Sequence, residues 1–418
     1  MPVSFDPFSP SWRDDPYPKY RELRDAAPVH YSPEAKVWCV SRYEDVMFVL
    51  RGHDEFSSRA MMTQLMLGGE KAPPVTLGSL FFAARLLWKA RVNPFAIPNV
   101  PSLIASDGQR HTLLRAIVNR GFTPRQIGEW EKRAREIVAA CMAGLHSGSF
   151  DVVRDLAIPL PVTVIAEMLG IEPERRHDFK RWSDVVIDNA TGAGRANPFA
   201  PAVLDAFAEM TTYVVRIARE RRKRPADDLI SQLVSINEGE GLSPIELVQF
   251  VTLLLVAGNE TTTNLIGNAT AALLAHPEQL ARVAADPGLV PSLVEETLRF
   301  DAPIQLIFRE ALADVEVAGV RIPAGATVVP LLGSANRDER RFPDPDAFDV
   351  TRNPQGHVGF GFGKHFCLGA SLARLEARVA LEALAPELLR MRHGEARVSR
   401  VDSFLVRGPS RLPLLEAA

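Results

Sequence analysis

A single cysteine, Cys367, lies between closely spaced glycines in the run Phe360-Gly361-Phe362-Gly363-Lys364-His365-Phe366-Cys367-Leu368-Gly369, and a pattern of helical period follows directly. A thiolate there would face the N-terminus of a helix, where unpaired backbone N–H groups and the helix dipole favour negative charge and lower a thiol pKa. The glycines allow tight turns and the close approach of a large flat partner. Cys367 is therefore a candidate nucleophile or metal ligand, suited to hold a haem iron from one face.

Three other interpretations of the glycine-rich segment around Cys367 can be compared with its residues. A lone cysteine before a helix is often a small buried hydrophobic residue, and that interpretation stays open. A phosphate-binding P-loop would need Gly at Val358 and Ser or Thr at His365, and a dinucleotide-binding pattern that starts at Gly359 would need Gly at Lys364. Both phosphate-binding patterns are excluded.

A polar break interrupts the most apolar helical pattern of the chain. Ser243 and Glu246 form a capping-box pattern that predicts the helix start, and the pattern continues to about Ala275. The break reads Ala257-Gly258-Asn259-Glu260-Thr261-Thr262, in which Gly disfavours a helix interior and Glu is rarely buried without a partner. It predicts either a groove over a cofactor, with an acid and a hydroxyl that handle protons, or a close helix contact with Glu260 and Thr261 facing solvent.

The elements that must position these residues are mostly helical. The 418 residues carry a net charge of −3, which argues against nucleic-acid binding, and the three scattered cysteines fit neither a disulfide framework nor a zinc site. No signal peptide or transmembrane anchor is expected, so we predict a cytoplasmic protein. We expect a single domain over residues 1–418, with β structure at roughly 28–41, 307–331 and 395–415.

The run around Cys367 resembles the haem-binding loop of the cytochrome P450 monooxygenases, and the polar break resembles the oxygen-activation motif of the same family. Glu296-Thr297-Leu298-Arg299 resembles its Glu-x-x-Arg pair. Matches in family order span residues 107–122, 257–262, 296–299, 309, 336–352 and 360–376. The resemblance implies a cytochrome P450 fold, mainly α with minor β, with haem b between the long central helix and the Cys-bearing loop and helix.

The resemblance also assigns roles to residues. Cys367 would be the axial ligand of the haem iron, Thr261 would hydrogen-bond dioxygen, and Glu260 would help to relay protons. Glu296 and Arg299 would be a structural pair. The cofactor would contact Phe360 and Gly369 of the loop, and its propionates would meet His111, Arg115, Arg309 and His365. The positions matched to a substrate pocket are Val100, Leu103, Ile104, Leu254, Ala257, Ile304, Leu306, Phe404 and Leu405.

The chain departs from common family patterns in several places. Ala347 stands where many relatives have an arginine that completes a charge triad, so Arg337, Arg341 or Arg352 would have to substitute. Glu260 stands where Asp is commoner. Residues 77–89 lengthen the segment before His111 and form either a surface helix, a lid over the pocket mouth, or a face that meets a lipid store or a partner.

These features predict a monooxygenase that hydroxylates or epoxidises a hydrophobic small molecule, such as a terpenoid, a steroid or a fatty-acid-like compound, because the matched pocket positions carry no charge. No flavin or nicotinamide motif is visible, so electrons would come from a separate ferredoxin and its reductase, with Arg110, Lys364 and Arg374 as docking charges. A monomer is expected. A haem-thiolate peroxygenase, a ligand sensor and a haem-free scaffold remain as alternatives.

Overall fold

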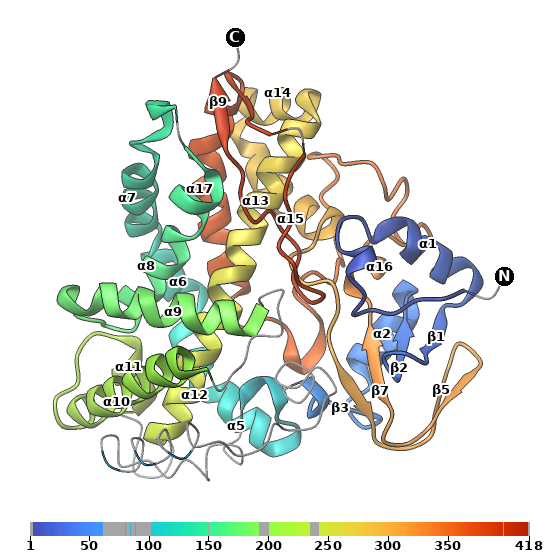
Figure 1. Cartoon of the computed structure of the whole chain (residues 1–418), viewed down its shortest axis with the longest axis horizontal. Coiled ribbons are helices and arrows are strands. Elements are labelled where there is room, and N and C mark those ends of the chain that lie inside the picture. The colour runs from blue at the N-terminus through green and yellow to red at the C-terminus, as the bar shows by residue number, and fades with distance from the viewer. Residues whose placement is uncertain are drawn as a thin grey trace.

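A large helical part lies beside a smaller part that contains the main sheet (Figure 1). The computed structural model describes residues 3–61, 80, 84, 88, 102–148, 150–191, 200–234, 242–395 and 397–416, with the backbone alone for 186–191. Val100 and most of residues 77–89 lie outside these ranges, so the pocket position at Val100 and the surface-helix and lid alternatives stay predictions.

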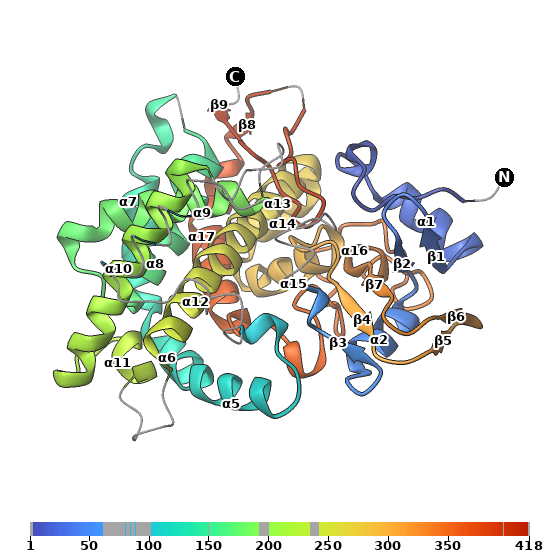
Figure 2. The same cartoon turned by 60° about the horizontal axis from the view of Figure 1, so that its bottom comes forward.

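The helical part is built around α12 and α13, which run through its centre, with α13 packed against α17 and α12 against α10 (Figure 2). The helices are α1 (Tyr17–Ala26), α2 (Tyr43–Arg51), α5 (Gly108–Asn119), α6 (Pro124–Glu129), α7 (Glu131–Met142), α8 (Pro159–Met168), α9 (Arg176–Thr191), α10 (Pro201–Lys223), α11 (Leu229–Val234), α12 (Pro244–Leu254), α13 (Glu260–Ala275), α14 (Pro277–Ala285), α15 (Val290–Phe300), α16 (Leu332–Ala335) and α17 (Ala370–Leu388).

The main sheet has the strand order β1-β2-β7-β4-β3, in which β2 and β7 run parallel and the other neighbours antiparallel. Two separate two-stranded antiparallel sheets, β5 with β6 and β8 with β9, complete the described strands. The strands are β1 (Val29–Ser32), β2 (Val37–Val40), β3 (Phe56–Ser57), β4 (Arg309–Ala311), β5 (Val315–Val317), β6 (Val320–Ile322), β7 (Thr327–Pro330), β8 (Met391–His393) and β9 (Leu414–Glu416).

Local sequence explains the start of the central helix. The hydroxyl of Ser243 accepts from the Glu246 N–H while the Glu246 carboxylate accepts from the Ser243 N–H, and Pro244 occupies the first helical position. The helix ends before His276, as the pattern predicted. Its apolar surface is buried in a cluster that includes Leu265 of α13 and Leu381 of α17.

The mainly helical fold class with minor β is confirmed. Strands β1, β2 and β4 to β7 fall within the predicted 28–41 and 307–331, whereas β3 at Phe56–Ser57 lies outside both ranges and was not predicted. In the tail, only Leu414 and Leu415 of β9 fall within the predicted 395–415, and the described residues before them form isolated bridges. Pro409 and Pro413 lack the N–H that a ladder needs, which is the physical reason for the difference.

Candidate haem-thiolate site

The polar break of the long helix is a π-helical turn, Leu255–Asn259, between α12 and α13. Gly258 permits close packing there, because a Cβ on it would lie 2.9 Å from Cδ1 of Ile165 on α8. The Thr261 hydroxyl donates to the Ala257 carbonyl over 2.6 Å, which pairs a carbonyl of the widened turn. Ala257 is exposed although the helix runs through the core, so this side of the turn borders open space.

The neighbouring side chains divide between two faces of this helix. Asn259 is buried and its Nδ2 donates to the hydroxyl of Ser183 on α9, 3.0 Å away. Thr261 follows Ala257 by four residues and therefore lies on the face that borders the open space. Glu260 and Thr261 are both half-buried, and the Oε2 atom of Glu260 is buried.

The loop before α17 is a set of tight turns that fixes Cys367. Gly361 and Gly363 have φ values of 68° and 73°, a conformation that other residues rarely adopt. The Cys367 N–H donates to the Phe360 carbonyl over 3.0 Å, which closes the loop on itself. A Cβ on Gly363 would lie 2.9 Å from Nε2 of His53, so the loop also packs closely on the segment after α2.

The thiol of Cys367 lies where the start of α17 can stabilise its anion. Burial raises the pKa of Cys367, whereas the Gly369 N–H, Arg115, Arg374 and the Ala370 N–H lower it. The net direction is upward, so the lowered pKa expected from the sequence is wrong for the protein by itself. The predicted donors are present, and burial outweighs them.

Basic side chains converge next to this loop from three elements. The rings of His111 on α5 and His365 in the loop lie 4.2 Å apart between centroids. Nε2 of His365 lies 2.9 Å from the Ser58 hydroxyl, and Asp107 accepts from the Ser58 N–H over 3.0 Å. Arg309 on β4 is buried, and its Nη1 donates to the carbonyl of Phe308. The structure thus brings together residues that lie far apart in the sequence.

Burial and mutual repulsion disfavour the charged forms of this basic cluster. Burial lowers the pKa of Arg309 to about 10, and burial followed by Arg309 lowers the pKa of His365 to about 3. Burial and then Arg115 lower the pKa of His111. Within the described ranges, Asp107 is the acid that opposes these shifts for all three groups. One carboxylate therefore faces three basic groups among the described residues, so the cluster has less negative than positive charge-bearing capacity.

A buried charge network joins α15 to the segment before the Cys367 loop. Arg299 donates from Nε and Nη2 to the two carboxylate oxygens of Glu296, each over 2.8 Å, and both side chains are fully buried. Nε of Arg352 lies 3.2 Å from Oε1 of Glu296. The Ala347 carbonyl accepts from both arginines. Arg352 therefore supplies the charge that position 347 lacks.

Comparisons with known proteins agree with this geometry. The family model described as Cytochrome P450 matches residues 288–386. The vitamin D(3) 25-hydroxylase of Pseudonocardia autotrophica is 39% identical over 418 residues, which cover 98% of this chain and 96% of that protein. The chain belongs to the cytochrome P450 family.

Solved structures and a second curated relative support the same assignment. Cytochrome P450 CYP109Q5 from Chondromyces apiculatus has a TM-score of 0.86 at 40% identity and covers 100% of this chain and 99% of its own. CYP109E1 from Bacillus megaterium in complex with corticosterone has a TM-score of 0.82 at 35% identity, covering 98% and 100%. The cytochrome P450 monooxygenase PikC of Streptomyces venezuelae is 37% identical over 383 residues, covering 88% and 83%.

Members of the cytochrome P450 family carry a haem-thiolate centre, and the residues of this chain fit one. The Nε2 atom of His111 is buried and finds no hydrogen-bond partner in the described part of the chain. Arg309 is buried without an ion pair in that same part. Two haem propionates would supply the negative charge that this cluster lacks, and Cys367 is the thiol beside it. None of the described helices is long and apolar enough to cross a bilayer.

The residues expected around a cytochrome P450 substrate belong to different packing clusters. Leu103 and Leu254 pack in the helical core, and Ile304 packs against the sheet. Four more pack with the N-terminal segment, namely Ile104, Leu306, Phe404 and Leu405. The Phe404 ring lies 5.0 Å from the Phe8 ring, so the N-terminal segment holds this side chain. The sequence carried no signal for that contact.

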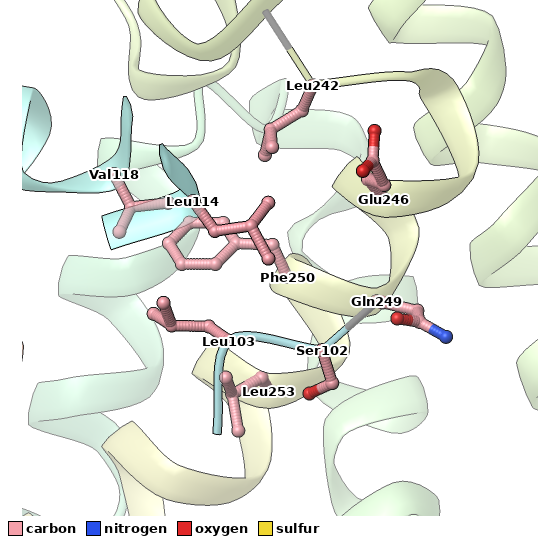
Figure 3. Close-up of a pocket in the computed structure, with 9 residues that line it drawn as sticks. All are labelled: Ser102, Leu103, Leu114, Val118, Leu242, Glu246, Gln249, Phe250 and Leu253. Atoms are coloured by element: carbon pink, nitrogen blue, oxygen red, sulfur yellow. The ribbon is translucent and has the colours of Figure 1, made fainter. Parts of the chain in front are cut away.

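A small cavity between α5 and α12 is too small for a substrate (Figure 3). Its volume is about 10 Å³, which is roughly the room that one water needs. Its lining includes Leu103, Leu114 and Phe250, with Glu246 and Gln249 at one side. Of the pocket residues expected from the sequence, only Leu103 lines this cavity among the described residues.

Sequence reasoning missed one unusual acid. Glu376 on α17 is buried, and burial raises its pKa to about 8 against a hydrogen bond with the Thr262 side chain. At neutral pH its carboxyl group is therefore mostly protonated. Its partner Thr262 lies on the facing helix α13 and directly follows Thr261. The position of Glu376 in the apolar stripe of Leu372, Leu375 and Val379 was the signal that could have found it.

Two of the three expected docking charges are already paired. Both Nε and Nη2 of Arg374 donate to the Glu295 carboxylate, over 2.6 and 2.9 Å, and Arg374 also lies over the Phe360 ring. Arg110 pairs with Glu246. Lys364 is exposed and has no ion pair within the ranges that the structure describes, so it remains the available cation of the three.

Proposed function

We propose that the chain holds haem b through the Cys367 thiolate and oxidises a hydrophobic small molecule with dioxygen. The observation that carries the proposal is the meeting of the Cys367 loop with the basic cluster of His111, Arg309 and His365. The helix that carries the π-helical turn and Thr261 packs on α17, which directly follows this loop. When bound, haem supplies the iron at which dioxygen is reduced. The side chains of the protein would bind the haem and the substrate and would deliver protons.

The residues that would hold the haem fall into three groups, which meet the iron, the propionates and the space beside the loop. Cys367 binds as the thiolate, which the N–H groups of Gly369 and Ala370 stabilise. Arg115, Arg309, His111 and His365 would bind the propionates. Phe360 gives an apolar side to the loop and Gly369 leaves room beside it, since a Cβ there would meet nothing within 4 Å.

Thr261 and Glu260 would handle protons at the π-helical turn. The Thr261 hydroxyl donates to the Ala257 carbonyl, so its oxygen keeps lone pairs that can accept a hydrogen bond from water or a protonated group in the open space. Glu260 is half-buried next to it and can exchange protons with solvent. The apolar positions Leu254 and Ala257 limit the water around them.

We infer a steroid-like or terpenoid-like substrate that is hydroxylated or epoxidised. A relative of this chain is a vitamin D(3) 25-hydroxylase, and CYP109E1 was crystallised with corticosterone and with testosterone. The expected pocket positions carry apolar side chains, for which binding follows buried apolar area.

We further propose that electrons come from a separate ferredoxin and reductase, that residues 1–418 form a single domain, and that the protein is a monomer. Cys39, Cys141 and Cys367 are all free, which favours a reducing compartment such as the cytoplasm.

Turnover of testosterone with a surrogate ferredoxin, its reductase and isotopically labelled dioxygen tests the reaction class. We expect one labelled oxygen atom in a hydroxylated or epoxidised product. Product formed from peroxide alone, with none from the ferredoxin system, would favour a peroxygenase. Haem binding without any oxidised product across a set of steroids, terpenoids and fatty acids would favour a ligand sensor.

A further inference from the structure

Residues 400–409, here called the tail loop, form a closed turn near the C-terminus. The Val401 N–H donates to the Gly408 carbonyl over 2.9 Å, and Arg400 and Pro409 form an antiparallel bridge. In Figure 1 the red C-terminal trace that includes this loop runs beside α13 and α15. The loop therefore has two neighbouring ends and a tip that contains Phe404 and Leu405.

Both ends of the tail loop bind one carboxylate. Nη1 of Arg400 lies 3.0 Å from Oδ2 of Asp301, and Nε of Arg407 lies 2.6 Å from Oδ1. The Tyr17 hydroxyl also donates to Oδ1 over 2.6 Å. Asp301 directly follows α15 and is buried, so these contacts compensate a charge that would otherwise be costly to bury.

Electrostatics agree with the contacts of Asp301. Burial by itself would raise the pKa of Asp301, but Arg407 and Arg400, followed by Tyr17 and Arg337, hold it well below its usual range. The carboxylate is therefore charged under ordinary conditions and attracts both ends of the loop.

The tail loop rests on the helix face that carries the polar break. A Cβ on Gly408 would collide with the Asn264 side chain, and one on Gly267 would collide with Pro409. Asn264 follows Glu260 by four residues and Thr261 by three, so all three lie on one face of α13. The tail loop is thus the neighbour of that face one turn beyond Thr261.

Asn268, one turn further along α13, ties the same elements together. Its Nδ2 donates to the carbonyls of Asp301 and Arg407, over 2.8 and 3.0 Å, and its Oδ1 accepts from Arg400 over 2.9 Å. On the other side of the loop, the Gln305 N–H donates to the Leu405 carbonyl over 2.9 Å. Asp301 therefore contacts both ends of the tail loop, while Arg407 also donates to the carbonyls of Arg13 and Asp14 in the N-terminal segment.

We propose that Asp301 is a positioning residue that clamps the tail loop against the face of α13 bearing Glu260 and Thr261, and so sets the shape of the wall that a bulky ligand meets. This inference deepens the proposed function, because the ligand would lie over the haem beside that face. A merely structural ion pair would change stability and leave the discrimination between small and bulky ligands unchanged.

The test uses the holoenzyme and two nitrogen ligands of haem that differ in size, imidazole and phenylimidazole. In Asp301→Asn, which keeps the shape and removes the charge, the dissociation constant of phenylimidazole should change by about fivefold or more. The constant for imidazole should stay within about twofold, because a small ligand does not reach the wall. Arg400→Gln removes one of the two ion pairs of Asp301. It should shift the ratio of the phenylimidazole and imidazole dissociation constants in the same direction, but by a smaller factor.

Hydrogen exchange provides a second readout that does not depend on haem. Amides of residues 401–408 should exchange faster in Asp301→Asn than in the natural protein. The matched control is Asp228→Asn, which removes another buried acid whose Oδ2 lies 2.5 Å from Nε of Arg221. Asp228→Asn should lower the stability of the protein. It should leave unchanged both the ratio of the two dissociation constants and the hydrogen-exchange rates of the amides of residues 401–408.

Equal changes for both ligands, or none for either, with unaltered exchange of the tail loop would overturn the proposal. If Asp301→Asn does not fold, Arg400→Gln decides by the same criteria. A natural protein whose absorbance does not respond to imidazole would contradict the haem assignment instead, and the clamp would then stand or fall on hydrogen exchange.

Discussion

Arg352 and Glu296, 56 residues apart, lie within 3.2 Å between Nε and Oε1, and Arg299 holds the same carboxylate from its own helix. The pair joins α15 to the segment that leads into the Cys367 loop. The charge that many cytochrome P450 sequences place at the position of Ala347 is therefore supplied from five residues further along the chain.

Arg352→Ala should lower the free energy of unfolding of the holoprotein by about 1–3 kcal/mol, because it removes charge-assisted hydrogen bonds to Glu296 and to loop carbonyls. Glu296→Gln should cost roughly 3–5 kcal/mol, because Arg299 then stays buried without its counter-charge. Urea unfolding followed by the haem absorbance measures both. Arg282→Ala is the control, since its exposed side chain only reaches Asp349 at 4.0 Å. An Arg352→Ala protein as stable as the control would contradict this role.

Glu376→Gln should stabilise the protein in a pH-dependent way. The native pKa of about 8 exceeds the ordinary value, so the folded state keeps a proton that the unfolded chain releases as pH rises above roughly 4.5. The glutamate protein therefore loses stability between these pH values, and the glutamine protein does not. Thermal unfolding should show an advantage of about 1 kcal/mol or more for Glu376→Gln near pH 8 and almost none near pH 5.

The surface variant Glu382→Gln serves as a control for that effect, since Glu382 pairs with Arg378 at the surface of the same helix. A pH-independent difference for Glu376→Gln would mean that the native acid titrates normally. The prediction would then fail.

Thr261→Ala should reduce the fraction of electrons that appear in product by several-fold and release the rest as peroxide, because the hydroxyl that positions a proton donor is lost. Thr261→Ser should keep most of the coupling. Thr263→Ala is the matched control, since its hydroxyl donates to the Ala157 carbonyl over 2.9 Å, away from the open space. Simultaneous assays of reductant, peroxide and product measure the ratio. Equal coupling in Thr261→Ala and Thr263→Ala would exclude a proton role for Thr261.

Arg309→Met should weaken haem retention by tenfold or more (about 1.4 kcal/mol), because a buried propionate would lose a charged partner. Arg309→Lys should recover part of this loss. Transfer of haem to apomyoglobin measures the dissociation rate, with Arg321→Met on the exposed β6 strand as control. Retention equal to that of the control would place the propionates elsewhere.

Lys364→Glu should slow reduction by an acidic ferredoxin several-fold at low ionic strength, with the difference shrinking as salt rises. Arg110→Glu should act less, because Arg110 already pairs with Glu246. Stopped-flow reduction under carbon monoxide measures the rates. If the reduction rate of Lys364→Glu equals that of the natural protein, the ferredoxin does not dock next to the Cys367 loop.

The sequence was sufficient for features that depend on local chemistry. The capping box of Ser243 and Glu246 predicted the start of the long helix, and Gly258 with Thr261 marked the place where it widens. It could not reveal that Arg352, rather than Arg337 or Arg341, reaches Glu296, because that choice depends on how distant segments pack. Nor could it predict the net pKa of Cys367, since helix donors lower it and burial, which is a tertiary property, raises it.

The tail loop shows the same limit. The sequence placed Phe404 at the pocket by family position, which stays a prediction, and it could not reveal that the Phe404 ring packs on Phe8 of the N-terminal segment. Asp301 carried no motif at all, and its importance comes from the two arginines that meet there only in the folded chain.

The most direct test of the account is the absorbance spectrum of the reduced, carbon-monoxide-bound protein and of its Cys367→His variant. The account predicts a Soret band at the thiolate-type wavelength in the natural protein and its loss in Cys367→His. Persistence of that band in the variant, or a natural protein that stays colourless after supply with haem, would contradict it.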